Sequence, residues 1–206
     1  LSLLEEYPCR YHISQLSSAK SVDVIKKCRK SGQKFTAGVS INNLSLNEND
    51  IGDFKTFMKI SPPLRKEHDR KALIEGIKNG LIDVIVSDHK PEDEESKRLT
   101  FSQAATGASG IETLLPLALE LFHNDSIKLN KIIKLLTSNP AKILKINKGN
   151  LNIGNDADFC IVDLYKPKVV KKEKMISKSK NTCIEDKKLQ GVVTNTFVKG
   201  EELFKV

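Results

Sequence analysis

One segment constrains the fold of this chain more than any other, because in it an apolar run stops abruptly at an acid and an imidazole. Residues 82–86 read Ile-Asp-Val-Ile-Val, and Asp88 and His89 follow after one serine. A short run rich in β-branched residues predicts a buried strand over residues 82–87. The carboxyl ends of buried parallel strands are where α/β proteins place reactive side chains. The segment therefore predicts a parallel α/β sheet with a candidate site around Asp88.

The chain before this strand repeats a strand-and-helix unit. The expected strands are residues 9–14 and 34–40, and the expected helices are residues 18–31 and 67–79. Gly32 and Gly80 follow the helices, at the position where glycine commonly ends a helix. Asn42 and Asn43 are expected in the loop after the second strand. Alternating strands and helices of this length predict parallel βα units. Three such strands amount to about three-eighths of an eight-stranded barrel.

The chain beyond the third strand changes character. Helices are expected over residues 111–122 and 128–136, and a third over residues 141–146, with Asn139 as its N-cap and Pro140 as its first residue. Glycine turns then alternate with short apolar runs, which predict strands. These strands are expected within residues 149–163, 191–197 and 201–204. The pattern divides the chain into residues 1–146, which hold the βα units and the following helices, and residues 147–206, which hold the later strands.

Composition excludes several classes of protein. With 206 residues and 39% hydrophobic content, the chain can bury a substantial core. No apolar run approaches the roughly 20 residues that a membrane-spanning helix needs, and the first residues lack the features of a signal peptide. A cytoplasmic location without membrane association is therefore expected. The cysteines form no C-x-x-C pair, which argues against a zinc ribbon or a disulfide framework and predicts buried thiols. They are Cys9, Cys28, Cys160 and Cys183.

The formal charge of +8 raises the question of an anionic partner. Lysines are spread along the chain. The densest run, residues 166–180, holds seven of them without interleaved aromatic residues or a recognisable nucleic-acid-binding module. Nucleic acid is therefore not an expected partner. Two interpretations of this run remain: a solvated surface, or a docking face for an acidic partner.

Six segments of the sequence, taken in order, resemble a known family. They are residues 11–19 (Tyr-His-Ile-Ser-Gln-Leu-Ser-Ser-Ala), 60–65 (Ile-Ser-Pro-Pro-Leu-Arg), 88–92 (Asp-His-Lys-Pro-Glu), 110–117 (Gly-Ile-Glu-Thr-Leu-Leu-Pro-Leu), and Asn181-Thr182 with 191–200. Together they resemble the dihydroorotases, zinc amidohydrolases of pyrimidine synthesis. The resemblance implies the C-terminal part of an amidohydrolase (β/α)8 TIM barrel plus strands of a small β-sandwich, with the N-terminal half of the same barrel as a partner. Dihydropyrimidinases and allantoinases share the barrel but fit two of the segments less well.

The resemblance assigns roles to five positions. Asp88 is retained where the family has an acid that binds the metal side of the site and shuttles a proton, and Gly107 falls in the loop that faces the substrate. Gln15 stands where the family has a histidine ligand, and a neutral amide binds zinc poorly. Ser61 replaces an asparagine that hydrogen-bonds the substrate. Glu92 replaces a histidine that helps to hold the substrate's carboxylate, which an anionic Glu92 would repel.

The histidines give little support for a metal site. On a strand, His12 is an odd number of residues from position 15 and therefore points to the opposite face, which favours a packing role. The remaining histidines have weak claims as ligands: His68, His89 and His123. The family's other ligands correspond to positions upstream of Leu1. Zinc, the cofactor of the family, is therefore not expected to be bound by this chain alone, and Asp88 is its candidate ligand if a site survives.

Two hypotheses of different classes follow. The first is a non-catalytic dihydroorotase homologue that acts as a structural partner of aspartate transcarbamoylase, as the resemblance implies for such homologues. The alternative is the C-terminal part of an active zinc dihydroorotase, which would hydrolyse the cyclic amide of dihydroorotate or cyclise N-carbamoyl-aspartate. The first is favoured because Gln15, Ser61 and Glu92 change one ligand and two substrate contacts together.

Overall fold

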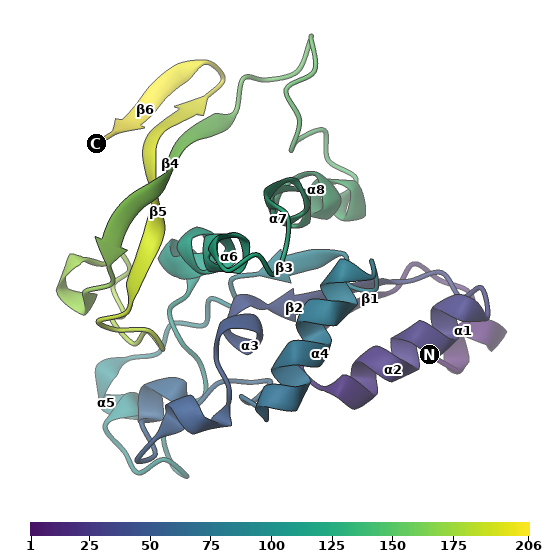
Figure 1. Ribbon diagram of the computed structural model, residues 1–206, viewed down its shortest axis with the longest axis horizontal. Helices are drawn as coiled ribbons and strands as arrows, with labels where there is room; N and C mark the ends of the chain where they lie inside the picture. Colours follow the sequence, from purple (N-terminus) through teal and green to yellow (C-terminus); the bar gives the residue numbers. More distant parts are fainter. The chain divides into compact units, whose positions relative to one another are not determined.

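The computed structural model describes residues 1–206 as two compact units, each with its own sheet (Figure 1). The first unit comprises residues 1–111 and 175–183, and the second comprises residues 112–174 and 184–206. A parallel sheet of three strands, in the order β1-β2-β3, belongs to the first unit, and an antiparallel sheet, β4-β5-β6, belongs to the second. The division of the chain into residues 1–146 and 147–206 stays a prediction.

The first unit contains the βα units that the sequence predicts. Its main elements are β1 (His12–Leu16), α2 (Ala19–Lys30), β2 (Thr36–Ser40), α4 (Glu67–Lys78) and β3 (Val84–Val86). The predicted first strand is displaced: it was expected over residues 9–14, whereas the pairing with β2 begins at His12 opposite Thr36. The apolar run alone does not reveal where a neighbouring strand begins to accept hydrogen bonds. The expected α/β class is confirmed.

Packing around the central strand forms the core of this unit. Every residue of β2 from Ala37 to Ser40 is buried, and a Cβ on Gly38 would lie 2.5 Å from the carbonyl oxygen of Ser14, so only glycine allows β1 this close. The helices α2 and α4 pack against each other and bury apolar side chains at helical spacing. The buried side chains of the two helices are Val22, Ile25, Leu73, Ile74 and Ile77. Burying one such side chain fully stabilises the folded state by about 1.5 to 3 kcal/mol.

Asn42 and Asn43 lie in a short buried helix, α3 (Ile41–Ser45), and the expectation of a loop at these residues is wrong. Ser40 caps the helix, because its hydroxyl oxygen accepts from the backbone N–H of Asn42 at 3.3 Å. The side chain of Asn43 donates to the carbonyl oxygen of Pro63 at 3.0 Å. A serine cap at a strand end is a weak local signal, and the buried position depends on this distant partner.

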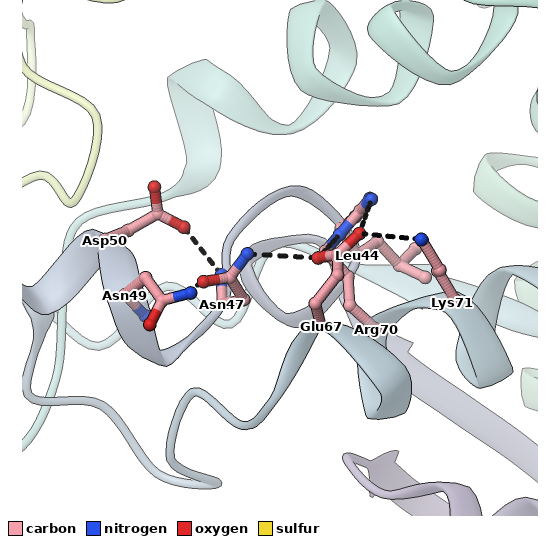
Figure 2. Close-up of polar contacts among 7 residues, drawn as sticks. All are labelled: Leu44, Asn47, Asn49, Asp50, Glu67, Arg70 and Lys71. Atoms are coloured by element: carbon pink, nitrogen blue, oxygen red, sulfur yellow. Dashed lines mark hydrogen bonds and ion pairs between the residues drawn. The ribbon is translucent and has the colours of Figure 1, made fainter.

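Further short elements connect the core elements of the first unit. They are α1 (Leu3–Glu6), the 3-10 turns η1 (Glu48–Ile51) and η2 (Thr56–Met58), and α5 (Glu94–Lys97). Figure 2 shows how the start of α4 is tied to the segment before η1. Arg70 donates two hydrogen bonds of 2.7 Å to Glu67 and a third, of 3.0 Å, to the carbonyl oxygen of Leu44. Asn47 donates to Glu67 at 3.0 Å. The Arg70 bonds hold the pKa of Glu67 at about 2.

The second unit combines three helices with a long antiparallel ribbon. Its elements are the 3-10 turn η3 (Ile111–Thr113), which begins one residue before it, α6 (Leu114–His123), α7 (Leu129–Leu136), α8 (Ser138–Leu144), β4 (Phe159–Val169), the 3-10 turn η4 (Lys172–Lys174), β5 (Lys188–Val198) and β6 (Glu201–Lys205). Gly191 lets β5 pack on α6, because a Cβ there would lie 2.3 Å from Cδ1 of Leu119. The strands β4 and β5 are longer than predicted, since each continues across a register shift in their pairing.

The start of α8 corrects a prediction. Asn139 was expected to cap a helix over residues 141–146, but the helix begins at Ser138 with Thr137 as its N-cap residue. The Thr137 hydroxyl donates to the carbonyl oxygen of Ile133 in α7 at 2.7 Å. Thr137 thus joins the two helices without a loop, and Pro140 lies in the first turn, where its missing N–H costs nothing.

The cysteines depart from the expectation of buried thiols. Cys9 and Cys160 are exposed, Cys28 is half-buried, and Cys183 is buried. Cys160 lies on β4, most of whose side chains are exposed, so the absence of a C-x-x-C pair did not imply burial. No helix combines the length and the apolar character that crossing a membrane requires.

Candidate functional site

The candidate site begins where β1 and β3 end. Gln15 is the penultimate residue of β1, and Asp88 lies two residues beyond β3. Because the strands are parallel, their carboxyl ends share one edge of the sheet. The Gln15 amide Nε2 donates to Oδ1 of Asp88 at 2.6 Å. Asp88 adopts a left-handed backbone conformation, with φ of 50°, which aspartate tolerates better than most residues. The structure therefore brings together Asp88 and Gln15, two positions to which the resemblance assigns a role.

Lys90 adds a cation to this pair. Its Nζ lies 3.1 Å from Oδ1 of Asp88, the same oxygen that Gln15 contacts, and donates to the carbonyl oxygen of Ser61 at 3.0 Å. The Asp88 side chain is 2% exposed, whereas the Lys90 side chain is 48% exposed. One carboxylate oxygen thus receives an amide N–H and an ammonium group. Ser61 contributes its carbonyl oxygen to this cluster, a contact that the sequence did not predict.

Glu92 and Gly107 also lie together. A Cβ on Gly107 would be 3.1 Å from a carboxylate oxygen of Glu92 and 2.5 Å from the carbonyl oxygen of Lys90, so the close approach requires glycine. Both residues are held by Asn181, which is buried. Its side-chain oxygen accepts from the Glu92 backbone N–H at 3.3 Å and from the Ser109 hydroxyl at 3.2 Å, and its Nδ2 donates to the carbonyl oxygen of Gly107 at 3.1 Å.

Neither Asn181 nor Ser109 was assigned a role from sequence. Asn181 belongs to one of the resembling segments, and its amide joins three chain positions. An asparagine in a polar stretch more than seventy residues from its partners gives no local signal of burial. Its role is to hold the segments that carry Glu92 and Gly107.

Lys97 also supports these segments, and the sequence contains no signal of this role. The residue is 2% exposed, and its Nζ donates to the carbonyl oxygens of Thr56, Lys59 and Ala105 at 3.2, 3.2 and 2.7 Å. Burial lowers the pKa of Lys97. The Lys59 carbonyl oxygen also accepts from the Gly107 backbone N–H at 3.0 Å. A lysine in a run of charged residues is typical of a solvated surface, so the sequence pattern indicated the opposite of what occurs.

Cys183 is packed beside this cluster. Its Sγ donates to the carbonyl oxygen of Phe57 at 3.1 Å, and burial raises the pKa of the thiol to about 12. A thiol with so high a pKa is a poor nucleophile and a poor metal ligand at neutral pH. Cys183 is therefore a packing residue.

The two histidines near the sheet are engaged elsewhere. Nδ1 of His89 accepts from the backbone N–H groups of Gly110 and Ile111 at 3.1 and 3.4 Å. Nδ1 of His12 lies 2.7 Å from the Thr36 hydroxyl. Burial lowers the pKa of His12, and the negative charge of Asp83 opposes this shift without cancelling it. The remaining two lie on helices: His68 in the first turn of α4 and His123 at the end of α6.

The residues of this chain do not fit a zinc ion. No three side chains among its histidines, cysteines, aspartates and glutamates form a group that could hold a metal, and a zinc site needs at least three protein ligands. The donor chemistry at Asp88 points the same way, because its Oδ1 is bonded to an amide N–H and faces an ammonium group. A divalent cation at that oxygen would be repelled by Lys90.

The fold and these strand ends define a class. The chain belongs to the amidohydrolase family, whose family model matches residues 4–203. Within that family it is similar to proteins named dihydroorotase. The relative from Ehrlichia canis is 41% identical over 194 residues, which cover 94% of this chain and 43% of the relative. That from Anaplasma phagocytophilum is 36% identical over the whole chain and 46% of the relative. The chain therefore spans about half the length of the curated relatives it matches.

Solved structures agree on the fold. The L-hydantoinase (dihydropyrimidinase) from Arthrobacter aurescens matches with a TM-score of 0.93 and 28% identity, over 99% of this chain and 47% of that one. The inactive dihydroorotase-like domain of a Chaetomium thermophilum CAD-like multifunctional protein matches with a TM-score of 0.74 and 20% identity, over 99% of this chain and 54% of that one. These likenesses confirm the predicted architecture as an amidohydrolase α/β fold, consistent with part of a (β/α)8 barrel.

Proposed function

We propose that this chain is a dihydroorotase-like module of pyrimidine biosynthesis that is non-catalytic and acts as a structural partner. One observation carries the proposal: the Gln15 amide donates to Asp88 at 2.6 Å. In the dihydroorotases that the sequence resembles, a histidine at position 15 and the acid at position 88 both serve the metal. In this chain the side chains at these two positions form a hydrogen bond with each other. A carboxylate oxygen that already receives an N–H group is poorly disposed to bind a metal or take up a proton.

The substrate positions support the same proposal. Glu92 lies beside Gly107, in the part of the site where the resemblance locates the carboxylate of the substrate. Two anionic carboxylates at close range repel each other, and the repulsion is strong where water is excluded. Ser61 presents its carbonyl oxygen to Lys90. Metal binding, proton transfer and substrate recognition have thus changed together, and groups that act as a unit are not restored one at a time.

The structural role that we propose rests on the open edges of the parallel sheet. In the sheet order β1-β2-β3, both β1 and β3 have a single hydrogen-bonded neighbour. Such edges favour pairing with further strands, and we propose the N-terminal half of the same barrel as the partner that supplies them. We further propose aspartate transcarbamoylase as the protein that the closed barrel contacts. Lys171 and Lys172 are paired with Asp186 and Glu185, so an acidic partner would meet only part of the charge of residues 166–180.

One observation favours the alternative, an active zinc dihydroorotase. Relatives about 40% identical to this chain carry that name, and Asp88 is retained at the expected strand end. Under this alternative Gln15 and Lys90 would move away from Asp88 when a metal binds. The two functions therefore differ in metal content and in rate.

The experiment measures both quantities on the protein as its gene encodes it. We expect well under one zinc per chain by elemental analysis, and a rate of dihydroorotate hydrolysis at background with zinc added. The variant Gln15→His should also stay at background. Zinc-dependent turnover in the unmodified protein would overturn the proposal, provided that Asp88→Asn abolishes it, because that control assigns the activity to this site.

The partnership has its own test. The protein is purified from its native cell under mild conditions and analysed by size-exclusion chromatography. We expect a complex that contains aspartate transcarbamoylase. Elution as a soluble monomer without any associated chain would count against this part of the proposal.

A further inference from the structure

Lys90 is the cation that contacts the most buried acid of the site, Asp88. The segment reads Asp-His-Lys-Pro-Glu, so Lys90 follows Asp88 by two residues and brings an ammonium group to it. That group lies 3.1 Å from Oδ1 of Asp88. We propose that Lys90 is a built-in counter-cation, which neutralises Asp88 in the place of a metal ion and keeps divalent metals from this carboxylate. The inference deepens the proposed function and rests on it.

Burial explains why Asp88 needs a cation. Its side chain is 2% exposed, and an isolated carboxylate removed from water is strongly disfavoured unless it is paired. The metal would supply the pairing charge in an active relative. Gln15 provides a hydrogen bond but no charge. Lys90 provides the missing charge.

The cost of this pairing is low for the lysine. Its side chain is 48% exposed, so the ammonium group keeps part of its hydration while it contacts the carboxylate. A pair in which both ions were buried would lose much of its attraction to desolvation. The pair therefore differs from an ordinary surface ion pair only in that its acid is buried.

The position of Lys90 is fixed by the surrounding backbone. Its N–H donates to the carbonyl oxygen of Ala108 at 2.9 Å, and its own carbonyl oxygen lies against Gly107. The ammonium group donates to the carbonyl oxygen of Ser61 at 3.0 Å. Contacts at both ends of the residue hold the cation over the acid.

Metal exclusion follows from the shared oxygen. A divalent ion at Oδ1 of Asp88 would have to displace two donors, the Gln15 amide and the Lys90 ammonium. A histidine at position 15 would remove the amide donor. The Lys90 ammonium group would still lie close to the ion and repel it. Restoring the histidine alone therefore leaves the obstacle in place.

A double-mutant cycle tests the pairing, on the protein as its gene encodes it. Lys90→Met should lower the midpoint of urea unfolding in the unmodified protein and have little effect in the Asp88→Asn background. Lys78→Met is the matched control, because Lys78 is similarly exposed (43%) but pairs with Glu75, which is 59% exposed. Its effect should be near zero. Equal shifts from Lys90→Met in both backgrounds would overturn the inference.

Zinc alone is the probe for metal exclusion. Added zinc should raise the unfolding midpoint of the double variant Gln15→His/Lys90→Ala more than that of Gln15→His, and the excess should vanish when Asp88→Asn is added. The same response to zinc in the single and double variants would contradict exclusion by Lys90. The proposed function fails separately, through turnover by the unmodified protein, so the two failures are distinguishable.

Discussion

Lys90 and Lys97 lie seven residues apart and serve the same site, yet they meet opposite surroundings. The Lys90 side chain is half-exposed and contacts a buried carboxylate, whereas Lys97 is buried and contacts three backbone carbonyl oxygens. The first lysine balances a charge. The second lysine places a charge inside the protein, where three neutral carbonyl groups accept hydrogen bonds from it. A buried ion in this fold is therefore tolerated either through a counter-ion or through complete hydrogen bonding.

This comparison predicts that replacing Lys97 lowers the free energy of unfolding more than replacing Lys90 does. In Lys97→Met the side chain keeps its length, but the carbonyl oxygens of Thr56, Lys59 and Ala105 lose the Lys97 ammonium donor, although those of Thr56 and Lys59 keep a backbone N–H donor. We expect a loss of about 3 to 5 kcal/mol in the free energy of unfolding, because three hydrogen bonds from a charged donor are lost at about 1.5 to 3 kcal/mol each, partly offset by the burial cost of the ammonium group that methionine avoids. Urea unfolding measures it. Arg98→Met is the control, because Arg98 directly follows α5 and its side chain is 62% exposed. A Lys97→Met loss below about 1 kcal/mol would show that the carbonyl groups accept hydrogen bonds from water instead.

Asn181, like Lys97, is a buried side chain with three hydrogen-bond partners, but it carries no charge. Its amide serves Glu92, Gly107 and Ser109, so Asn181→Ala leaves two donors and one carbonyl without this partner. We expect a loss of about 2 to 3 kcal/mol, less than for Lys97 because no charge is involved. Thermal or urea unfolding gives the value. A larger loss than that of Lys97→Met would reverse the ranking of charged and neutral clusters.

Local pattern explains which parts of the fold could be predicted. Helices α2 and α4 were predicted from the spacing of their apolar residues, and β3 from its apolar run. Both signals depend only on residues that are close together in the sequence. Asp88 was placed at a strand end for the same reason. The start of β1 and the buried position of Asn43 depend on partners twenty or more residues away, which no local window contains.

The candidate site shows the same division. The resemblance indicated Gln15, Ser61 and Glu92 as changed positions, but the contact between Gln15 and Asp88 spans 73 residues and appears only in the folded chain. Lys90 and Lys97 were hidden for a different reason. Both stand in polar stretches that predict solvent exposure, and only the carbonyl oxygens and the carboxylate around them reveal their roles.

A partly exposed ion pair should have a smaller effect on stability than either buried cluster. Glu67, bonded to Arg70 at the start of α4 (Figure 2), is more than a third exposed. Its pKa of about 2 lies below the ordinary value of 4.5, so its contribution to stability is present above pH 4.5 and is lost as the pH falls towards 2. We expect Glu67→Gln to cost under about 1 kcal/mol at pH 7. The gap to the unmodified protein should close in urea titrations below pH 4.5, and a gap that is independent of pH would assign the effect to packing.

His12 illustrates a third response to burial, in which the group gives up its charge. Burial lowers the pKa of His12 below 6.5, while Asp83 opposes the shift. The unfolded chain therefore takes up the proton first as the pH falls through 6.5, and the folded state loses stability until His12 itself is protonated. Proton NMR of the ring should give a titration midpoint below 6.5, and Asp83→Asn should move it lower still. Relative to His12→Gln, the unmodified protein should lose stability between pH 7.5 and the folded pKa. A midpoint at or above 6.5 would mean that the charge of Asp83 outweighs burial, and that His12 behaves as Lys90 does, as a partner of an acid.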